Sequence, residues 1–149
     1  MAGARTLVFL AILAALAWPA SAQDNAVGRV KSASGAAFVV RQNVTLPAQA
    51  GQPIFESDSI RTGADGRLGI TLKDETRVAL GPNSDVRIDQ FVYSPGQGKL
   101  RLVMKIARGL VAYVSGRIAK LSPDAVRLET PSAILGVRGT RMVIRVEGP

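Results

Sequence analysis

The sequence predicts an all-β fold in a single domain, a twisted β-sandwich or a solenoid-like β-roll of short strands. Three observations favour it. Apolar and polar residues alternate in one run after another from residue 27 onward, and turn-forming residues separate the runs. Beyond the N-terminal segment, no stretch keeps a helical period for three turns. Alternation with a period of two places one face of each strand in a core and the other in solvent.

The alternating runs follow one another along the chain. Apolar residues occupy every second position in five of them, at residues 68–72, 78–80, 86–88, 100–106 and 126–130, except that Thr130 takes the last such position. Strands starting near Arg67, Thr76 and Asp85 are about nine residues apart, a spacing typical of sandwiches and stacked β-coils. Two stretches are less regular. We expect 42–59 to be a loop with a short strand, and 115–124 to be a long connection that can carry a helical turn.

The N-terminal segment has the pattern of a secretory signal peptide. Arg5 precedes an apolar run from Leu7 to Trp18, and an Ala-x-Ala ending follows. This pattern predicts cleavage between Ala22 and Gln23, so that residues 1–22 are removed and residues 23–149 form the exported domain. The alternative is an uncleaved anchor, but the apolar run is shorter than the roughly 20 residues that a spanning helix needs. We therefore expect no transmembrane segment in the mature chain.

Composition excludes several kinds of site. The 149 residues include no cysteine and no histidine, which rules out disulfides, thiolate zinc sites and histidine-based catalytic triads. The five acids of the central region are expected to be scattered and solvated, in turns or at outward positions, at Asp65, Asp74, Glu75, Asp85 and Asp89. We therefore expect no enzyme activity, no cofactor and no metal.

The net charge of +8 is spread along the chain, and aromatic residues make up only 5%. Nucleic acid is a poor candidate partner because so few side chains can stack on bases. Most Arg and Lys residues fall at solvent-facing strand positions, which favours an evenly basic surface over a dedicated polyanion site.

Three stretches together resemble the FecR domain family. They are residues 50–66, with Asp58, Thr62 and Gly63; the paired alternating strands at 68–88; and residues 130–140, where we expect a turn at Thr130 and Pro131, followed by a short apolar run and Gly136-Val-Arg-Gly-Thr140. The resemblance covers about residues 50–146, and the 136–140 pentapeptide is its most specific part. It implies a β fold that works outside the cytoplasm, in the periplasm, as a protein-interaction and sensing module.

Signalling members of this family carry a cytoplasmic anti-sigma segment before a transmembrane helix, and their exported part contacts an outer-membrane receptor. We expect this chain to lack both the anti-sigma segment and the receptor-contacting C-terminal extension. Only six residues precede the apolar run, and the chain stops at Pro149. A complete transmembrane relay is therefore not expected.

The family-like residues are interpreted as structural. Asp58 is expected to cap backbone N–H groups beside Thr62, and Gly63 to adopt a positive φ in a turn. If alternation ran unbroken back from Val146, Arg138 would share the inward face with Gly136 and Thr140.

A buried guanidinium needs a partner, unless a bulge at Gly136 or Gly139 turns it outward. We predict the paired alternative, with Asp58 as the partner of Arg138. The pentapeptide then fastens the last strand to the 58–63 region, and is not itself the surface that binds a partner.

The leading functional hypothesis is a non-enzymatic, exported FecR-like domain that binds a periplasmic or other envelope protein, with exposed strand edges as the means. The alternative is a binder of anionic envelope polymer or lipid head groups through its basic strand faces. The sequence does not fix the partner or the oligomeric state.

Overall fold

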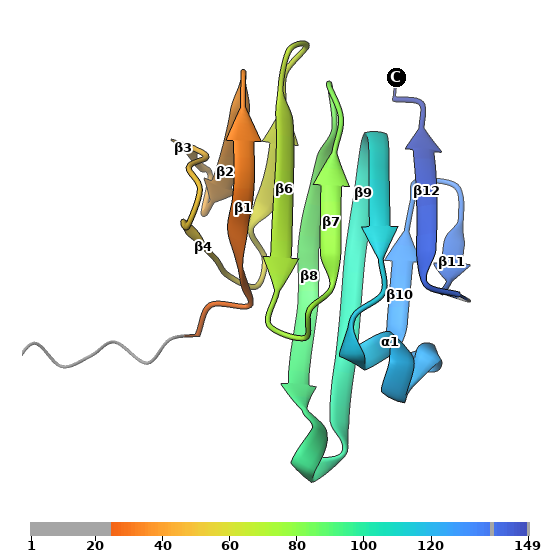
Figure 1. Ribbon diagram of the computed structural model, residues 1–149. Helices are drawn as coiled ribbons and strands as arrows, with labels where there is room; N and C mark the ends of the chain where they lie inside the picture. Colours follow the sequence, from red (N-terminus) through yellow and green to blue (C-terminus); the bar gives the residue numbers. More distant parts are fainter. Residues whose placement is uncertain (1–24, 138, 149) are drawn as a thin grey trace, which may run out of the picture.

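A computed structural model describes residues 25–137 and 139–148 of the chain, and in them it shows the expected all-β fold (Figure 1). The strands are β1 (Gly28–Ser34), β2 (Ala37–Arg41), β3 (Val44–Pro47), β4 (Pro53–Ile54), β5 (Ser59–Thr62), β6 (Arg67–Leu72), β7 (Arg77–Leu80), β8 (Asp85–Ser94), β9 (Lys99–Val114), β10 (Val126–Glu129), β11 (Ile134–Gly136) and β12 (Arg141–Val146). Three short helical segments join them, η1 (Pro95–Gln97), α1 (Arg117–Leu121) and η2 (Pro123–Ala125). None of the helices in the described ranges is long and apolar enough to cross a bilayer.

The strands form one curled sheet in the order β3-β2-β5-β8-β9-β7-β6-β1-β4, and β10, β11 and β12 extend it beyond this path. The curl places two layers face to face. In Figure 1 the layer of β1, β6, β7, β12 and the second half of β9 lies in front, and β2, β5, β8 and β10 lie behind it. The apolar side chains of both layers meet between them in one core, which includes Ile60, Ile70 and Val111.

The long strand β9 belongs to both layers. Its first half lies between β8, which is antiparallel, and β10, which is parallel. Its second half lies between β7 and β12, both antiparallel. All four neighbouring strands are therefore positioned by hydrogen bonds to this one strand.

The passage of β9 from one layer to the other occurs at Gly109. This glycine has a φ of +101°, and a Cβ atom there would lie 2.4 Å from Cα of Ser84. The Ser84 hydroxyl accepts a hydrogen bond from the backbone N–H of Leu110 at 3.1 Å. A left-handed backbone and a close approach to Ser84 both require glycine here, and together they bend the strand.

The expected runs at 68–72, 78–80 and 126–130 are strands with nearly the expected bounds, whereas β8 and β9 run longer than their alternation predicts. The 42–59 stretch holds two short strands, β3 and β4, instead of one. The expected helical turn within 115–124 is confirmed by α1 and η2.

We expect Gly109→Val to lower the free energy of unfolding by about 3 kcal/mol, because it adds both backbone strain and overlap with Ser84. Gly96→Ala is the control, since Gly96 has no positive φ and a Cβ atom added there would meet no other atom within 4 Å. Urea denaturation measures both. Equal midpoints for the two variants would show that the bend at Gly109 does not constrain the fold.

Candidate interaction site

Asp58 lies just before β5, is buried, and is bound by Arg41 and Phe55 in an arrangement that we call the clamp. Its carboxylate accepts hydrogen bonds from Nη2 of Arg41 at 2.8 Å and from the backbone N–H of Phe55 at 2.8 Å. The guanidinium of Arg41 also lies over the Phe55 ring, 4.4 Å from its centroid. The hydrogen bond to Asp58 raises the pKa of Arg41. The expectation that Asp58 caps a backbone N–H group is confirmed.

The partner of Asp58 in the described structure is Arg41, which the sequence reasoning did not single out. The predicted partner, Arg138, lies outside the described residues, so the Asp58–Arg138 pair stays a prediction. No signal in the sequence marks Arg41, because it stands 17 residues before Asp58 and the weakly patterned 42–59 stretch separates the two.

Thr62 and Gly63 join β5 to the turn after β7. The Thr62 hydroxyl donates to the carbonyl of Gly81 at 2.6 Å and accepts from the N–H of Ser84 at 2.9 Å. The expected positive φ at Gly63 is wrong. A Cβ atom at Gly63 would lie 2.9 Å from Cβ of Ala36, so the position excludes a side chain because of a close approach to another strand connection.

The expectation that the central acids are all solvated is wrong for Asp74. This residue is fully buried. Its carboxylate accepts hydrogen bonds from the N–H and hydroxyl of Thr76 and from the N–H of Ile118 at the start of α1. Alternation placed Asp74 in a turn but could not show that α1 returns to cover that turn.

The stretch 130–140 connects the two layers. Thr130 and Ala133 close the turn between β10 and β11, where the Thr130 hydroxyl accepts from the N–H of Ala133 at 3.1 Å. Pro131 is exposed within this turn. The expectation of a Thr-Pro turn before the apolar run is therefore confirmed.

Alternation does not run unbroken from Gly136 to Val146. β11 ends at Gly136 in one layer, and β12 begins at Arg141 in the other. Gly139, with a φ of +99°, lies in the connection between them. Ser115 holds that connection, because its hydroxyl donates to the carbonyl of Gly139 at 3.0 Å and its N–H donates to the carbonyl of Thr140 at 2.8 Å.

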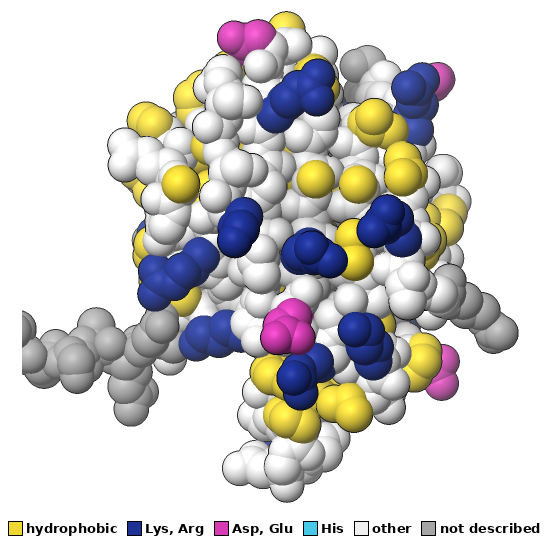
Figure 2. All heavy atoms as spheres, viewed as in Figure 1, with side chains coloured by type: hydrophobic (Ala, Val, Ile, Leu, Met, Phe, Trp, Pro, Cys, Tyr) yellow, Lys and Arg dark blue, Asp and Glu magenta, His cyan; other side chains and the backbone are white. Residues whose placement is uncertain are grey.

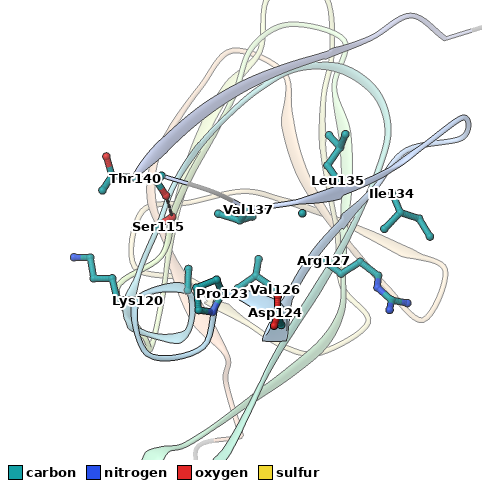
Figure 3. A pocket seen from close by; sticks show the side chains of 13 residues that line it. Ser115, Lys120, Pro123, Asp124, Val126, Arg127, Ile134, Leu135, Val137 and Thr140 are labelled. Carbon is teal, nitrogen blue, oxygen red and sulfur yellow. Dashed lines mark hydrogen bonds between the residues drawn. The ribbon is translucent and has the colours of Figure 1, made fainter.

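A cavity of about 690 Å³ lies beside this connection (Figure 3). Its walls come from α1, η2, β10, β11 and residues 137, 139 and 140. The apolar side chains of Val126, Leu135 and Val137 line it, and the ends of Lys120 and Arg127 lie at its margin in Figure 3. The cavity has the size and the mixed lining of a ligand or peptide pocket.

The sequence-predicted residues fall into two separate groups. Gly136, Gly139 and Thr140 line the cavity, whereas Asp58, Thr62 and Gly63 lie elsewhere, at β5 and the turns around it. Sequence reasoning missed the contribution of α1 and η2, through Ala119, Lys120 and Asp124. The sequence-based prediction treated the 136–140 pentapeptide as purely structural and did not foresee a cavity beside it.

Next to this cavity lies a side of the molecule that we call the open edge, which consists of the outer edges of β11 and β12. A second hollow of about 440 Å³ lies between the 130–132 turn and β12, and both hollows share Leu135. Within the described ranges, β11 pairs only with β10 and β12 pairs only with β9. Each layer therefore ends on this side in an unpaired strand edge, with Ile134 and Val143 strongly exposed on those two strands.

Comparison with known proteins gives one finding that decides the family. The family described as FecR protein matches residues 58–149, which is more than half of the chain. The chain belongs to the FecR family. This family is regulatory and sensing in character and associated with the cell envelope. No curated protein and no solved structure matches the chain.

We expect Arg41→Ala to lower the free energy of unfolding by about 3 kcal/mol, because the Asp58 carboxylate, 2% exposed, is left buried without its countercharge. Arg61→Ala is the matched control. It removes an arginine from Asp85 in a pair whose arginine side chain is 47% exposed, and should cost less than about 1 kcal/mol. Chemical denaturation distinguishes the two, and similar losses would contradict the clamp.

Tyr113 is 1% exposed, and its hydroxyl makes no hydrogen bond to any residue in the described ranges. Burial raises the pKa of Tyr113, and the charge of Asp74 adds to the rise. The hydroxyls of Ser115 and Thr76 oppose it by their proximity, although neither meets the distance and angle of a hydrogen bond.

Above the ordinary tyrosine pKa of about 10, the unfolded chain loses a proton that the folded chain keeps, so stability falls as the pH rises through that value. We expect Tyr113→Phe to remove this part of the alkaline loss and to be neutral or stabilising at pH 7, because no hydrogen bond is lost. Thermal unfolding at pH 7 and at about pH 11 measures both effects. A large loss at pH 7 would show that the phenol is bonded.

Proposed function

We propose that this FecR-family protein is a non-enzymatic, exported interaction and sensing module of the periplasm, whose partner is another envelope protein. The observation that carries the proposal is the open edge formed by β11 and β12. It offers an unpaired backbone, two exposed apolar side chains and adjoining hollows in one place. An extended segment of a partner can add to such an edge through backbone hydrogen bonds.

The hydrogen-bond pattern identifies the outward-pointing groups of β12. The N–H of Ser115 bonds the carbonyl of Thr140, so this pair is a hydrogen-bonded one in the antiparallel ladder. Such pairs alternate along the strands, so Met142 and Ile144 also bond β9, and the backbone groups of Arg141, Val143 and Arg145 point to the free side. These three residues are the ones a partner strand would pair with.

The positive charge on β12 favours a partner segment of a particular composition. The side chains of Arg141, Val143 and Arg145 are all exposed and share one face. Antiparallel pairing of β12 with a second copy of itself would bring these arginines together, which is unfavourable. A partner segment with an acidic, an apolar and an acidic residue at alternate positions complements this strand. Its opposite face would place apolar side chains toward Leu135 and Ile144 in the adjoining hollow.

The edge is tested with Val143→Pro, which removes an outward-pointing N–H and leaves the ladder to β9 intact. Val143→Thr is the control, because it keeps both the N–H and the branched shape. With each variant immobilised, an envelope extract is passed over it and bound proteins are quantified by mass spectrometry. We expect a protein retained by the wild type and by Val143→Thr to be lost with Val143→Pro. Equal retention by both variants would exclude strand addition at β12.

Export is tested separately. When the full chain is expressed in a Gram-negative host, we expect it in the periplasmic fraction with Gln23 as its first residue, measured by intact mass. An unprocessed chain in the cytoplasm would overturn the export proposal and leave the edge proposal standing.

A further inference from the structure

The outer face of the front layer carries side chains in rows that follow from the strand register. One row holds Arg29, Thr71, Arg77, Val114 and Arg141, taken across β1, β6, β7, β9 and β12. The next row holds Ser32, Gly69, Ala79, Ala112 and Val143. The third includes Arg67, Leu110 and Arg145. Basic rows therefore flank a row of small residues.

The small residues leave a trough in this face. A hollow of about 190 Å³ is lined by Gly69, Ala79 and Ala112 at its floor and by Lys31 and Arg77 at its sides. Lys31 lies at the register shift in β1 and borders a neighbouring hollow of about 500 Å³ as well. Figure 2 shows this face, with dark blue Lys and Arg side chains distributed around a central apolar area.

Four cations on this face, Lys31, Arg77, Arg141 and Arg145, differ from those of the rear layer because they form no ion pair with an acid among the described residues. On the rear layer, Arg61 pairs with Asp85, and both Arg87 and Lys105 pair with Asp89. None of the three rows contains an acid. Glu75, in the turn at the end of β6, is paired with Arg117 at 3.4 Å.

We propose that this face binds a linear acidic polysaccharide whose carboxylates pair with the arginines and whose sugar rings lie along the trough. Arg77 and Arg141 stand in one row two strands apart, about 9–10 Å, so they can bind successive carboxylates of an extended chain. Guanidinium groups bind carboxylates in a bidentate manner, and the Gly and Ala floor lets a narrow ring approach the sheet.

Other occupants fit this face less well. A membrane-binding face needs large apolar side chains that enter the bilayer, and the trough floor consists of small ones. Single-stranded nucleic acid needs aromatic platforms, and the three rows contain no aromatic residue. A protein strand needs a free backbone edge, whereas β6, β7 and the second half of β9, which form the trough, are each paired with a strand on both sides.

The probe is a set of polygalacturonate oligosaccharides, with dextran oligosaccharides as the uncharged control and phosphatidylglycerol vesicles as the lipid alternative. Binding to the purified protein is measured by calorimetry at about 0.15 M salt, where distant surface charges are screened. The test variant is the double substitution Lys31→Gln and Arg77→Gln. The control, Lys99→Gln and Arg101→Gln, removes the same charge from the β8–β9 hairpin, away from the trough.

We expect the test variant to bind polygalacturonate about tenfold more weakly and the control less than about threefold more weakly. Ala79→Leu, which narrows the trough without changing charge, should also weaken binding. Equal losses of affinity in the two double variants would show that binding depends on net charge alone, and this would overturn the proposal. So would binding of vesicles alone, unimpaired binding by Ala79→Leu, or no binding by the wild type. Retention of a protein partner at β12 should be unchanged in the test variant, which keeps the two proposals separable.

Discussion

The whole arrangement depends on the pairing of β9 along both of its edges and on its bend at Gly109. Four strands find their places against β9, and the bend assigns two of them to each layer. The contact between Gly109 and Ser84 fixes where the bend occurs, and Ser84 is in turn held by Thr62. The Thr62 and Ser84 hydroxyls therefore act on the layer geometry.

Local polar contacts then secure the parts that β9 does not reach. Asp58 fastens the end of β2 to the β4–β5 connection through Arg41 and Phe55, and Asp74 fastens α1 to the β6–β7 turn. Both carboxylates are buried and accept several hydrogen bonds, which offsets their loss of water. These acids hold connections in place, while the exposed cations of β7 and β12 remain on the surface.

Sequence reasoning could predict the fold class because alternation is a local property that each strand carries by itself. It could predict the Thr130 turn and the capping role of Asp58 for the same reason. It could not predict that β11 and β12 enter different layers, since the positive φ of Gly139 and the hold of Ser115 depend on the end of β9. The pairing of Arg41 with Asp58 and the burial of Asp74 could not be predicted either, because each depends on a segment distant in sequence.

The attachment of the last strands has a consequence for local unfolding. Among the strands that the structure describes, β10 and β12 pair with the rest of the sheet through β9 alone, and β11 pairs only with β10. The strands β10, β11 and β12 can therefore open as one cooperative unit while the other strands stay closed, which gives their amides less protection from hydrogen exchange than those of β6 and β7. The strands that form the open edge are thus also strands whose local opening needs less free energy than that of β6 and β7.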